Sequence, residues 1–423
     1  MSSAIEPLEA EAHQRGTGRT ADPSHSTWSR LVDAVVERFT GFDVPRFELE
    51  LPDGTMRLLG TIHAASDLGA ARFRLRVRNH AGARALGSFD EARTADAFMN
   101  GDLDVEGDFL AAFELRKCFS DHHPFWSIWR FIPPLLLGQV KSDRSMIPRH
   151  YDVGDDFYFS FLDRDIRLYS QALYKSDVET LESAARNKLD YIAAACKLQP
   201  GSTVLDVGAG WGSFSGYAAE RGVDVTMMTL AKKQFDHLTE MARSNSFPGR
   251  MEVVRESIYA YAPGKRFDAV VLLGVMEHLP DYRSLCRRFD RLLKPNGRVY
   301  MDFSAIRQKF KSSTTAYRHV FPGNHTPVVL HEFLAAANAS TFEAVEVHND
   351  RHSYFLTLAE WARRLESARA QLVARYGQRT FRLFQLYLWA TAHAMAVGTL
   401  ESYRVVMQKA LRSSSRDIGL SSG

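Results

Sequence analysis

The sequence predicts an α/β fold, a doubly wound Rossmann-like sheet preceded by a small α+β domain. From His150 onward, short apolar runs alternate with segments of helical period, the pattern of a parallel sheet covered by helices. The run FDAVVLLGV at 267–275 is almost continuously apolar, as expected of a strand buried on both faces. Another apolar run, at 202–208, leads into a glycine turn and then a helix. Sheets of this kind bind ligands at such turns, beyond the carboxyl ends of their strands.

Length and composition limit the classes of protein to which the chain can belong. Its 423 residues suggest two or three domains, and a net charge of +3 gives no argument for nucleic-acid binding. No apolar run reaches the ~18 residues of a membrane span. Three widely spaced cysteines exclude a disulfide scaffold and a zinc motif. With no secretion signal pattern at the N-terminus, we expect a cytoplasmic protein.

The first third of the chain predicts the small α+β domain. Residues 1–25 are polar and are expected to form a disordered tail. A helical period covers 29–39, and alternating runs at 47–60 and 73–79 predict strands, the first interrupted by a Pro-Asp-Gly turn. Residues 88–115 mix helix and turn signals. The expected domain spans residues 26–120.

A separate aromatic segment follows at 121–149. Phe125, Trp126 and Trp129 precede two prolines and three leucines, a run too short to cross a bilayer. The segment could anchor the protein in a membrane interface. We favour the alternative, an interdomain linker packed in the core.

The remaining elements belong to a second domain at 150–412, followed by a flexible tail at 413–423. Helices are expected at 180–198, 212–222, 231–245, 282–297, 358–376 and 381–398, and strands at 202–208, 223–230, 251–257, 267–275 and 297–304. The part beyond residue 305 is read as helical additions to the sheet.

The glycine turn discriminates between two cofactor classes. A dinucleotide site has the spacing G-x-G-x-x-G and an acidic residue after the second strand. Here the spacing is G-x-G-x-G, through Gly208, Gly210 and Gly212, and the second strand ends in 228–230 without an acid. Asp206 instead lies at the turn itself. This combination favours S-adenosylmethionine, which has no pyrophosphate to place on a helix N-terminus.

Ordered motifs from about residue 45 to 410 resemble the cyclopropane-fatty-acyl-phospholipid synthase family, which includes the mycolic acid cyclopropane synthases. The resemblance implies a class I S-adenosylmethionine-dependent methyltransferase fold. The segments that carry it are DAFMNGDLDVEGDF, RHYDVGDDFYFSFLD, LYSQALY, KLDYIAAACKLQPGSTVLDVGAGWGSF, VTMMTLAKKQ, FDAVVLLGVMEHL, HVFPGN, SYFLTLAEW and FRLFQLYLWATAHAMAVG.

By this resemblance, cofactor contacts would come from four places in the chain. They are the Tyr-Ser pair before the first strand of the sheet, the glycine turn, the end of the second strand and the loop after the third strand. This last loop would contact the adenine. The residues are Tyr169, Ser170, Asp206, Gly208, Gly210, Trp211, Gly212, Thr229, Leu230, Gln234, Glu256, Ser257 and Ile258.

The family reaction implied is methyl transfer to a cis double bond of a membrane acyl chain. An alkene is a weak nucleophile, so positioning supplies much of the rate. Positive charge develops on carbon, which aromatic faces and a carboxylate stabilise while water is excluded. A base then removes a proton. In the family this base is a bicarbonate held by a Cys, a Glu, a His, an Ile backbone group and a Tyr.

This sequence keeps only part of that set. Glu277 and Tyr354 match, but Gln171 stands at the Cys position, Asp302 at the His position and Ser304 at the Ile position. An anionic Asp302 would repel bicarbonate, so we hypothesise that none binds and that Asp302 or Glu277 is the base. The alternative is that Asp302 does not touch the reacting atoms and the chemistry is ordinary.

His278 is a further catalytic candidate, whereas His122 and His123 lack ligands at metal spacing, so no metal is expected. The leading function is C-methylation of unsaturated phospholipid acyl chains, giving a cyclopropane. The alternatives are a methylene- or methyl-branched product, another apolar substrate such as an isoprenoid, polyketide or carrier-bound lipid, and a lipid-binding protein without turnover. We expect peripheral contact with the inner membrane face and no nucleic acid; a homodimer stays open.

Overall fold

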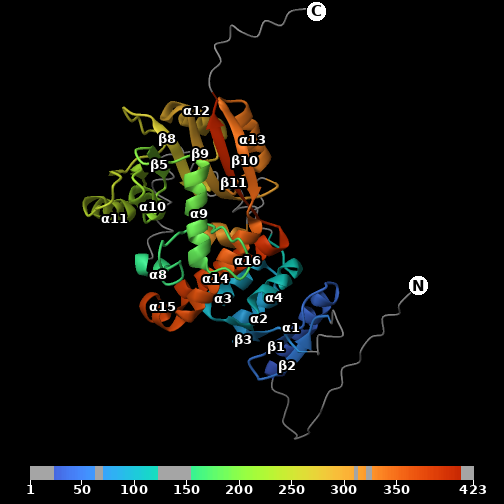
Figure 1. Ribbon diagram of the computed structural model, residues 1–423. Coiled ribbons are helices and arrows are strands. Elements are labelled where there is room, and N and C mark those ends of the chain that lie inside the picture. Colours follow the sequence, from blue (N-terminus) through green and yellow to red (C-terminus); the bar gives the residue numbers. More distant parts are fainter. Residues whose placement is uncertain (1–22, 62–69, 122–153, 309–312, 321–325, 411–423) are drawn as a thin grey trace, which may run out of the picture.

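The computed structural model describes residues 23–61, 70–121, 154–308, 313–320 and 326–410. They form two domains, each with its own sheet, and Figure 1 shows helix α16 (Gln378–Val397) between the two. The aromatic segment and nearly all of both expected tails lie outside the described residues. Within the described part, no helix is both long and apolar enough to cross a bilayer.

The N-terminal domain, residues 23–121, packs helices on a four-stranded sheet of order β2-β1-β3-β4. Strands β1 and β3 are parallel and the other two pairings are antiparallel. Helix α1 begins at Pro23, inside the expected tail. The elements are α1 (Pro23–Thr40), β1 (Phe47–Glu50), β2 (Met56–Leu59), β3 (Phe73–Val77), α2 (His80–Gly87), α3 (Glu91–Asn100), β4 (Leu103–Gly107), α4 (Phe109–Phe113) and η1 (Glu114–Cys118).

Polar side chains start three short helices of this domain. Asn79, Asp90 and Asp108 each accept hydrogen bonds from backbone N–H groups in the first turn of α2, α3 and α4. Such caps stabilise a helix by about 1 kcal/mol each. The apolar faces then pack on β1 and β3, where Phe47 stacks on Phe73 at 5.0 Å between ring centroids. The α+β domain predicted from the sequence is therefore present with its own core.

The second domain contains a seven-stranded sheet of order β10-β11-β9-β8-β5-β6-β7. Strands β5 to β9 are parallel to one another, and β11 is antiparallel to both β9 and β10. The elements are α8 (Asp155–Phe159), α9 (Leu181–Ala195), β5 (Thr203–Val207), α10 (Ser213–Glu220), β6 (Asp224–Met228), α11 (Lys232–Arg243), β7 (Met251–Val254), β8 (Phe267–Leu273), η2 (Met276–His278), α12 (Tyr282–Leu292), β9 (Leu293–Ala305), η3 (Ala316–Val320), α13 (Leu330–Asn338), β10 (Phe342–Asn349), α14 (Arg351–Ser367), α15 (Arg369–Tyr376), α16 and β11 (Glu401–Lys409).

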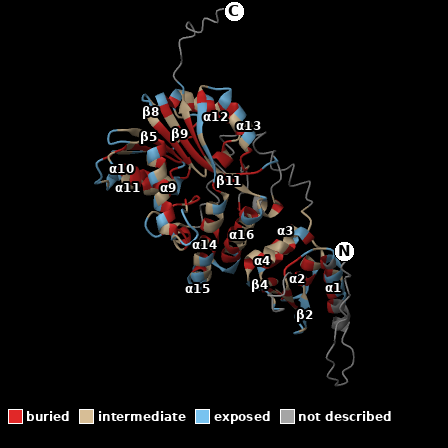
Figure 2. Ribbon diagram, turned by 45° about the vertical axis from the view of Figure 1, so that its right-hand side comes forward, coloured by how far each residue is buried: buried red, intermediate tan, exposed pale blue. Residues whose placement is uncertain are grey.

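The sheet confirms the Rossmann-like prediction, and its centre is the most buried part of the chain, as Figure 2 shows for β5, β8 and β9. Three details differ from the sequence prediction. Strands β10 and β11 complete the sheet where only helical additions were expected. Strand β9 begins at Leu293, before the Lys-Pro-Asn-Gly stretch. The helix predicted at 358–376 is two helices, and the first starts at Arg351.

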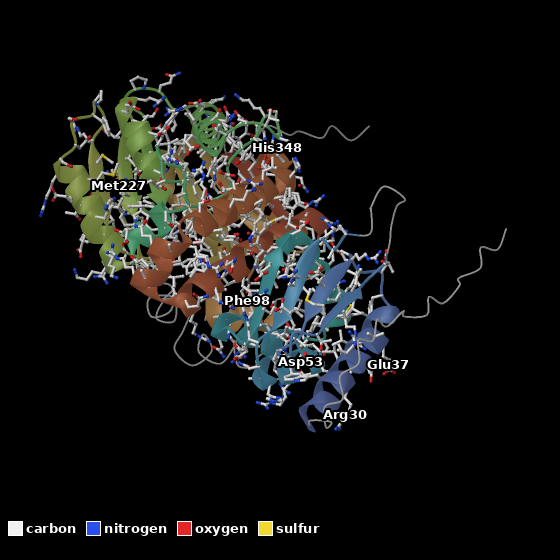
Figure 3. The ribbon with its side chains drawn as sticks, turned by 90° about the horizontal axis from the view of Figure 1, so that it is seen from below. Arg30, Glu37, Asp53, Phe98, Met227 and His348 are labelled. Atoms are coloured by element: carbon white, nitrogen blue, oxygen red, sulfur yellow. The ribbon has the colours of Figure 1, made fainter. Side chains whose placement is uncertain are left out.

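Helix α16 joins the two domains. Arg382 is buried and donates to the backbone oxygens of Phe98 at 2.7 Å and Leu103 at 2.8 Å, and it pairs with Asp104. Figure 3 labels Phe98 where the N-terminal domain meets this helix. Trp389 stacks on Phe109 at 6.1 Å between centroids. The joint therefore combines a desolvated ion pair with aromatic packing.

We expect Arg382→Met to lower the free energy of unfolding by roughly 1–3 kcal/mol, because it leaves two buried backbone oxygens without their donor, while Asp104 keeps its ion pair with Arg78. Thermal unfolding measures this effect. Arg379→Met is the matched control, since Arg379 bonds Asn100 at an exposed site. Equal losses in the two variants would contradict the role given to Arg382.

Candidate active site

The glycine turn between β5 and α10 takes a conformation that suits glycine. Gly208, Gly210 and Gly212 all have positive φ, at 73°, 57° and 81°. A Cβ on Gly208 would come 2.5 Å from the Val275 side chain, so its absence brings the loop after β8 close to the turn. The N–H groups of Gly208 and Ala209 both bond the carbonyl of Met228, which fixes the turn against β6.

Gly212 has a different role from the other two glycines. A Cβ there would lie 2.6 Å from the sulfur of Met241 and 3.1 Å from Leu238, both on α11. Gly212 is absent from the lining of the cavity described next. Its predicted place among the cofactor contacts is therefore better explained by the close packing of α10 against α11.

A cavity of about 1080 Å³ opens beside the turn, at the carboxyl ends of the parallel strands. Most residues singled out in the sequence line it. They are Tyr169, Ser170, Asp206, Gly208, Gly210, Trp211, Thr229, Leu230, Gln234, Glu256, Ser257, Ile258, Glu277, His278 and Tyr354. Gln171 and Asp302 do not line it, although both are buried nearby.

The cofactor side of the cavity is polar at the strand ends. Thr229 donates to the Gln234 amide oxygen at 2.7 Å, which ties the end of β6 to α11. Asp206 accepts from the Ser215 hydroxyl at 2.6 Å. Burial raises the pKa of Asp206 to about 7, and the Ser215 hydrogen bond opposes the shift. A buried acid here is poised to accept a hydrogen bond from a bound ligand or to interact with a cation.

Aromatic rings form another part of the cavity wall. Tyr169 stacks on Trp361, with centroids 5.4 Å apart and an interplanar angle of 24°, and meets Trp211 edge-on at 6.0 Å. Trp211 also contacts Tyr158 and Phe159. These rings come from four different segments of the chain. They exclude water from one side of the cavity and offer faces that attract positive charge.

Glu277 is the buried carboxylate of the site. It lies in the short η2 helix after β8, and its Oε1 accepts the backbone N–H of Ser304 at 2.7 Å. Its Oε2 is buried and has no hydrogen-bond partner in the described part of the chain. Burial raises the pKa of Glu277 to about 7, against the opposing effect of the Ser304 N–H. A pKa near the working pH suits a general base, which acts in its deprotonated form and must release the proton afterwards.

Tyr354 and His278 line the same cavity. Tyr354 is on α14 and is partly buried; desolvation raises the pKa of its phenol well above the ordinary value, so it stays a neutral hydroxyl. The structure thus brings Glu277, Tyr354 and Ser304 to one region, although they come from three separate elements.

Asp302 faces away from the cavity into an ion pair. Its Oδ2 lies 2.8 Å from Nζ of Lys188, and its Oδ1 accepts the N–H of Gly274 at 3.1 Å. Lys188 also donates to the Ser170 hydroxyl at 2.5 Å. The expected repulsion between Asp302 and bicarbonate did not take this lysine into account, which opposes the charge; the Asp302 carboxylate still contributes to the raised pKa of Glu277. Since Asp302 does not line the cavity, its predicted role as a base loses its geometric support.

Gln171 is likewise held behind the site. Its amide nitrogen donates to Asp350 at 3.0 Å, its oxygen accepts from the Ser402 hydroxyl, and Arg404 pairs with Asp350. This network links the Tyr-Ser-Gln segment to β11, which the sequence analysis did not predict. The sequence analysis also did not single out Lys188. The pattern that could have identified it is a lysine on the apolar face of a helix, at a position where a leucine is expected.

The residues at the cavity fit S-adenosylmethionine. The glycine turn is a cradle that a Cβ at Gly208 would fill, and Asp206 and Glu256 bring carboxylates to the cavity, Thr229 a hydroxyl and Gln234 an amide. Such groups can hold an amino-acid end and a nucleoside end of one ligand. The apolar remainder of the cavity leaves room for a second, water-poor substrate.

Replacing Lys188 by Met tests whether the buried pair supports the site. The single change leaves Asp302 as an uncompensated buried charge and should lower the free energy of unfolding by about 3–5 kcal/mol. The double variant Lys188→Met/Asp302→Leu should recover most of the loss, because no charge remains buried. Thermal unfolding of the two proteins decides: a double variant no more stable than the single one would contradict the pairing.

Comparison with known proteins places the chain in a family. The mycolic acid cyclopropane synthetase family matches residues 139–405. Sphingolipid C9-methyltransferase of Komagataella phaffii is 26% identical over 345 residues, covering 76% of this chain and 70% of that protein. Cyclopropane-fatty-acyl-phospholipid synthase of Escherichia coli is 28% identical over 301 residues, covering 70% and 76%.

A solved structure of a mycolic acid cyclopropane synthase, complexed with SAH and CTAB, superposes with a TM-score of 0.58 at 25% identity. It covers 63% of this chain and 98% of its own. The seven-stranded sheet, the glycine turn and the cavity are consistent with this match. The chain belongs to the mycolic acid cyclopropane synthetase family, and it is a methyltransferase with S-adenosylmethionine as its cofactor.

Proposed function

We propose that the protein transfers a methyl group to a double-bond carbon of an unsaturated lipid acyl chain, with Glu277 as the base. One observation carries the proposal: the cavity that holds the glycine turn also holds a buried carboxylate with a free oxygen, and continues as an apolar space. An alkene substrate needs such a water-poor space, because water would trap the cation.

S-adenosylmethionine supplies an electrophilic methyl group when bound. The residues Tyr169, Ser170, Gly208, Gly210 and Thr229 would hold it, and the remaining cofactor residues predicted from the sequence would complete the pocket apart from Gly212. The protein's task is then to orient the double bond and stabilise positive charge on its second carbon. Tyr169, Trp361 and Tyr387 line the cavity and present aromatic rings for this purpose.

We assign Glu277 as the base that accepts the proton because of the residues around it. The resemblance assigns an unspecified backbone group at position 304 to a bicarbonate, and here the N–H of Ser304 is donated to Glu277. The positions of the family's Cys and His are taken by Gln171 and Asp302, which bond to Asp350 and Lys188 and do not line the cavity. A bicarbonate would therefore lack the Cys and the His that hold it in the family. Glu277 Oε2 accepts the proton as the cation collapses to a neutral product.

The neutral product depends on which carbon loses this proton. If the new methyl loses it, closure of a carbon–carbon bond gives a cyclopropane and formation of a double bond gives a methylene branch. If the proton leaves a carbon of the acyl chain, the product is a methyl-branched alkene. One relative is named for cyclopropane synthesis and another for sphingolipid C9-methylation, and the two are similar to this chain to nearly the same degree. We favour phospholipid acyl chains as substrates, approached from the cytoplasmic membrane face.

The direct test supplies labelled S-adenosylmethionine with vesicles of cis-unsaturated phospholipid. We expect label in the fatty acids, and mass spectrometry distinguishes a ring from a branch. Vesicles of saturated phospholipid are the control and should stay unlabelled, because they offer no alkene. The same assay is run with vesicles that contain unsaturated sphingolipid. Label there and none in the phospholipid would overturn the phospholipid assignment, and no label in either lipid would overturn the acyl substrate.

The pH dependence tests Glu277. A base must be deprotonated, so kcat should rise with pH through about 7, the pKa of Glu277, and level off above it. Glu277→Gln should lower kcat by at least ~100-fold and remove this rise. The assay uses saturating cofactor, because the pKa of Asp206 is also about 7. His278→Gln is the control; loss of the profile there instead would transfer the role to His278.

A further inference from the structure

We propose that the N-terminal domain receives the methyl end of the substrate's acyl chain. The cavity extends beyond the methyltransferase site into this domain, where apolar residues of its core line it, among them Phe73, Leu75, Leu86, Leu103 and Phe109. We call this part the N-terminal branch. The proposal rests on the proposed function and adds the place where the hydrocarbon lies.

Helix α16 makes the cavity continuous. Leu383 and Leu386 line it beside the N-terminal domain, and Ala390 and Ala394 line it further along the same helix. The cavity lining then includes Leu400, just before β11. One wall therefore runs from the N-terminal core to the region of Ser304 and Glu277. An acyl chain laid along this helix would have its double bond at the carboxylate and its end in the N-terminal branch.

The lining of the N-terminal branch suits hydrocarbon. Its residues come from β3, β4, α2 and α4, and their side chains are apolar and buried. A surface of such side chains accepts apolar ligands rather than polar ones.

The buried end of the N-terminal branch identifies which end of the chain it takes. Phe73, Leu75, Leu86 and Leu103 are at most 6% exposed, so a polar headgroup could not stay hydrated beside them. Four charged residues of the same domain also line the cavity; they keep contact with solvent and pair with one another, Arg116 with Glu91 and Lys117 with Glu114. The methyl end is the part of a lipid that can enter without losing hydration.

Photolabelling tests the site without requiring turnover. The probe is a long-chain cis-unsaturated fatty acid with a diazirine at its methyl end, irradiated with the full-length protein and S-adenosylhomocysteine. We expect adducts on peptides that contain β3, β4 or α4. Adducts confined to the methyltransferase domain, or spread over the surface, would overturn the proposal. Labelling of the N-terminal branch in a protein that methylates no lipid would instead disprove only the proposed function.

A filling variant supplies the second measurement. Ala112 on α4 lines the cavity, so Ala112→Phe should shorten the N-terminal branch and reduce labelling there at least tenfold. Ala81→Phe on α2 is the matched control, because Ala81 is only partly buried and does not line the cavity. Thermal unfolding checks that both variants fold. Unchanged labelling in a folded Ala112→Phe protein would contradict the proposed site.

The dependence of kcat/KM on the length of the acyl substrate tests the same Ala112→Phe variant. Substrates share the position of the double bond and differ only in the methylenes beyond it. Each methylene displaced from the N-terminal branch should lower kcat/KM by roughly fourfold for detergent-dispersed substrates, so the variant should prefer shorter chains. An equal loss at every length would show that the branch does not measure the chain, and would overturn the proposal.

Discussion

The buried Lys188–Asp302 pair holds the methyltransferase site together. Neither group is solvated, so each needs the other, and both sit where three segments converge. Lys188 on α9 reaches Ser170 before the sheet, and Asp302 on β9 reaches the N–H of Gly274 after β8. Ser170 and Gly274 both line the cavity. A charge pair outside the cavity thus fixes the distance between two of its walls.

The same arrangement separates two kinds of polar group. Lys188, Asp302, Gln171 and Asp350 satisfy one another behind the site, whereas Glu277 keeps one oxygen unpaired inside it. Burial raises the pKa of Glu277 and of Asp302 alike, but only Asp302 has a cation beside it to oppose the shift. The difference in partner, rather than in depth, distinguishes a structural carboxylate from a reactive one.

Much of this was predictable from local sequence. The alternating strands and helices, the left-handed glycine turn and the position of Glu277 all follow from short patterns. The pairing partners did not, because Lys188 and Asp302 are 114 residues apart in the numbering of the chain and no periodicity links them. Strands β10 and β11 were also missed: β10 is largely exposed along its length, so its sequence lacks the apolar run that marks a central strand.

Gly212 and Asp302 show that a residue at a motif position can have a structural role instead of the role the motif implies. A glycine in a cofactor motif can serve helix packing, and a carboxylate at a catalytic position can serve a lysine. Sequence resemblance transfers the position along the chain. Only the direction of the side chain decides whether the position still faces the substrate.

The joint at α16 has a consequence for how the protein can be divided. Leu386 and Trp389 pack against the N-terminal core, although they belong to the methyltransferase half of the chain. A fragment cut near residue 150 would expose this apolar face to water and open the shared cavity at one end, inviting self-association. The two halves differ in topology, yet neither encloses the reaction space alone. The two domains therefore form one unit, and either evolution or protein engineering would have to exchange them together.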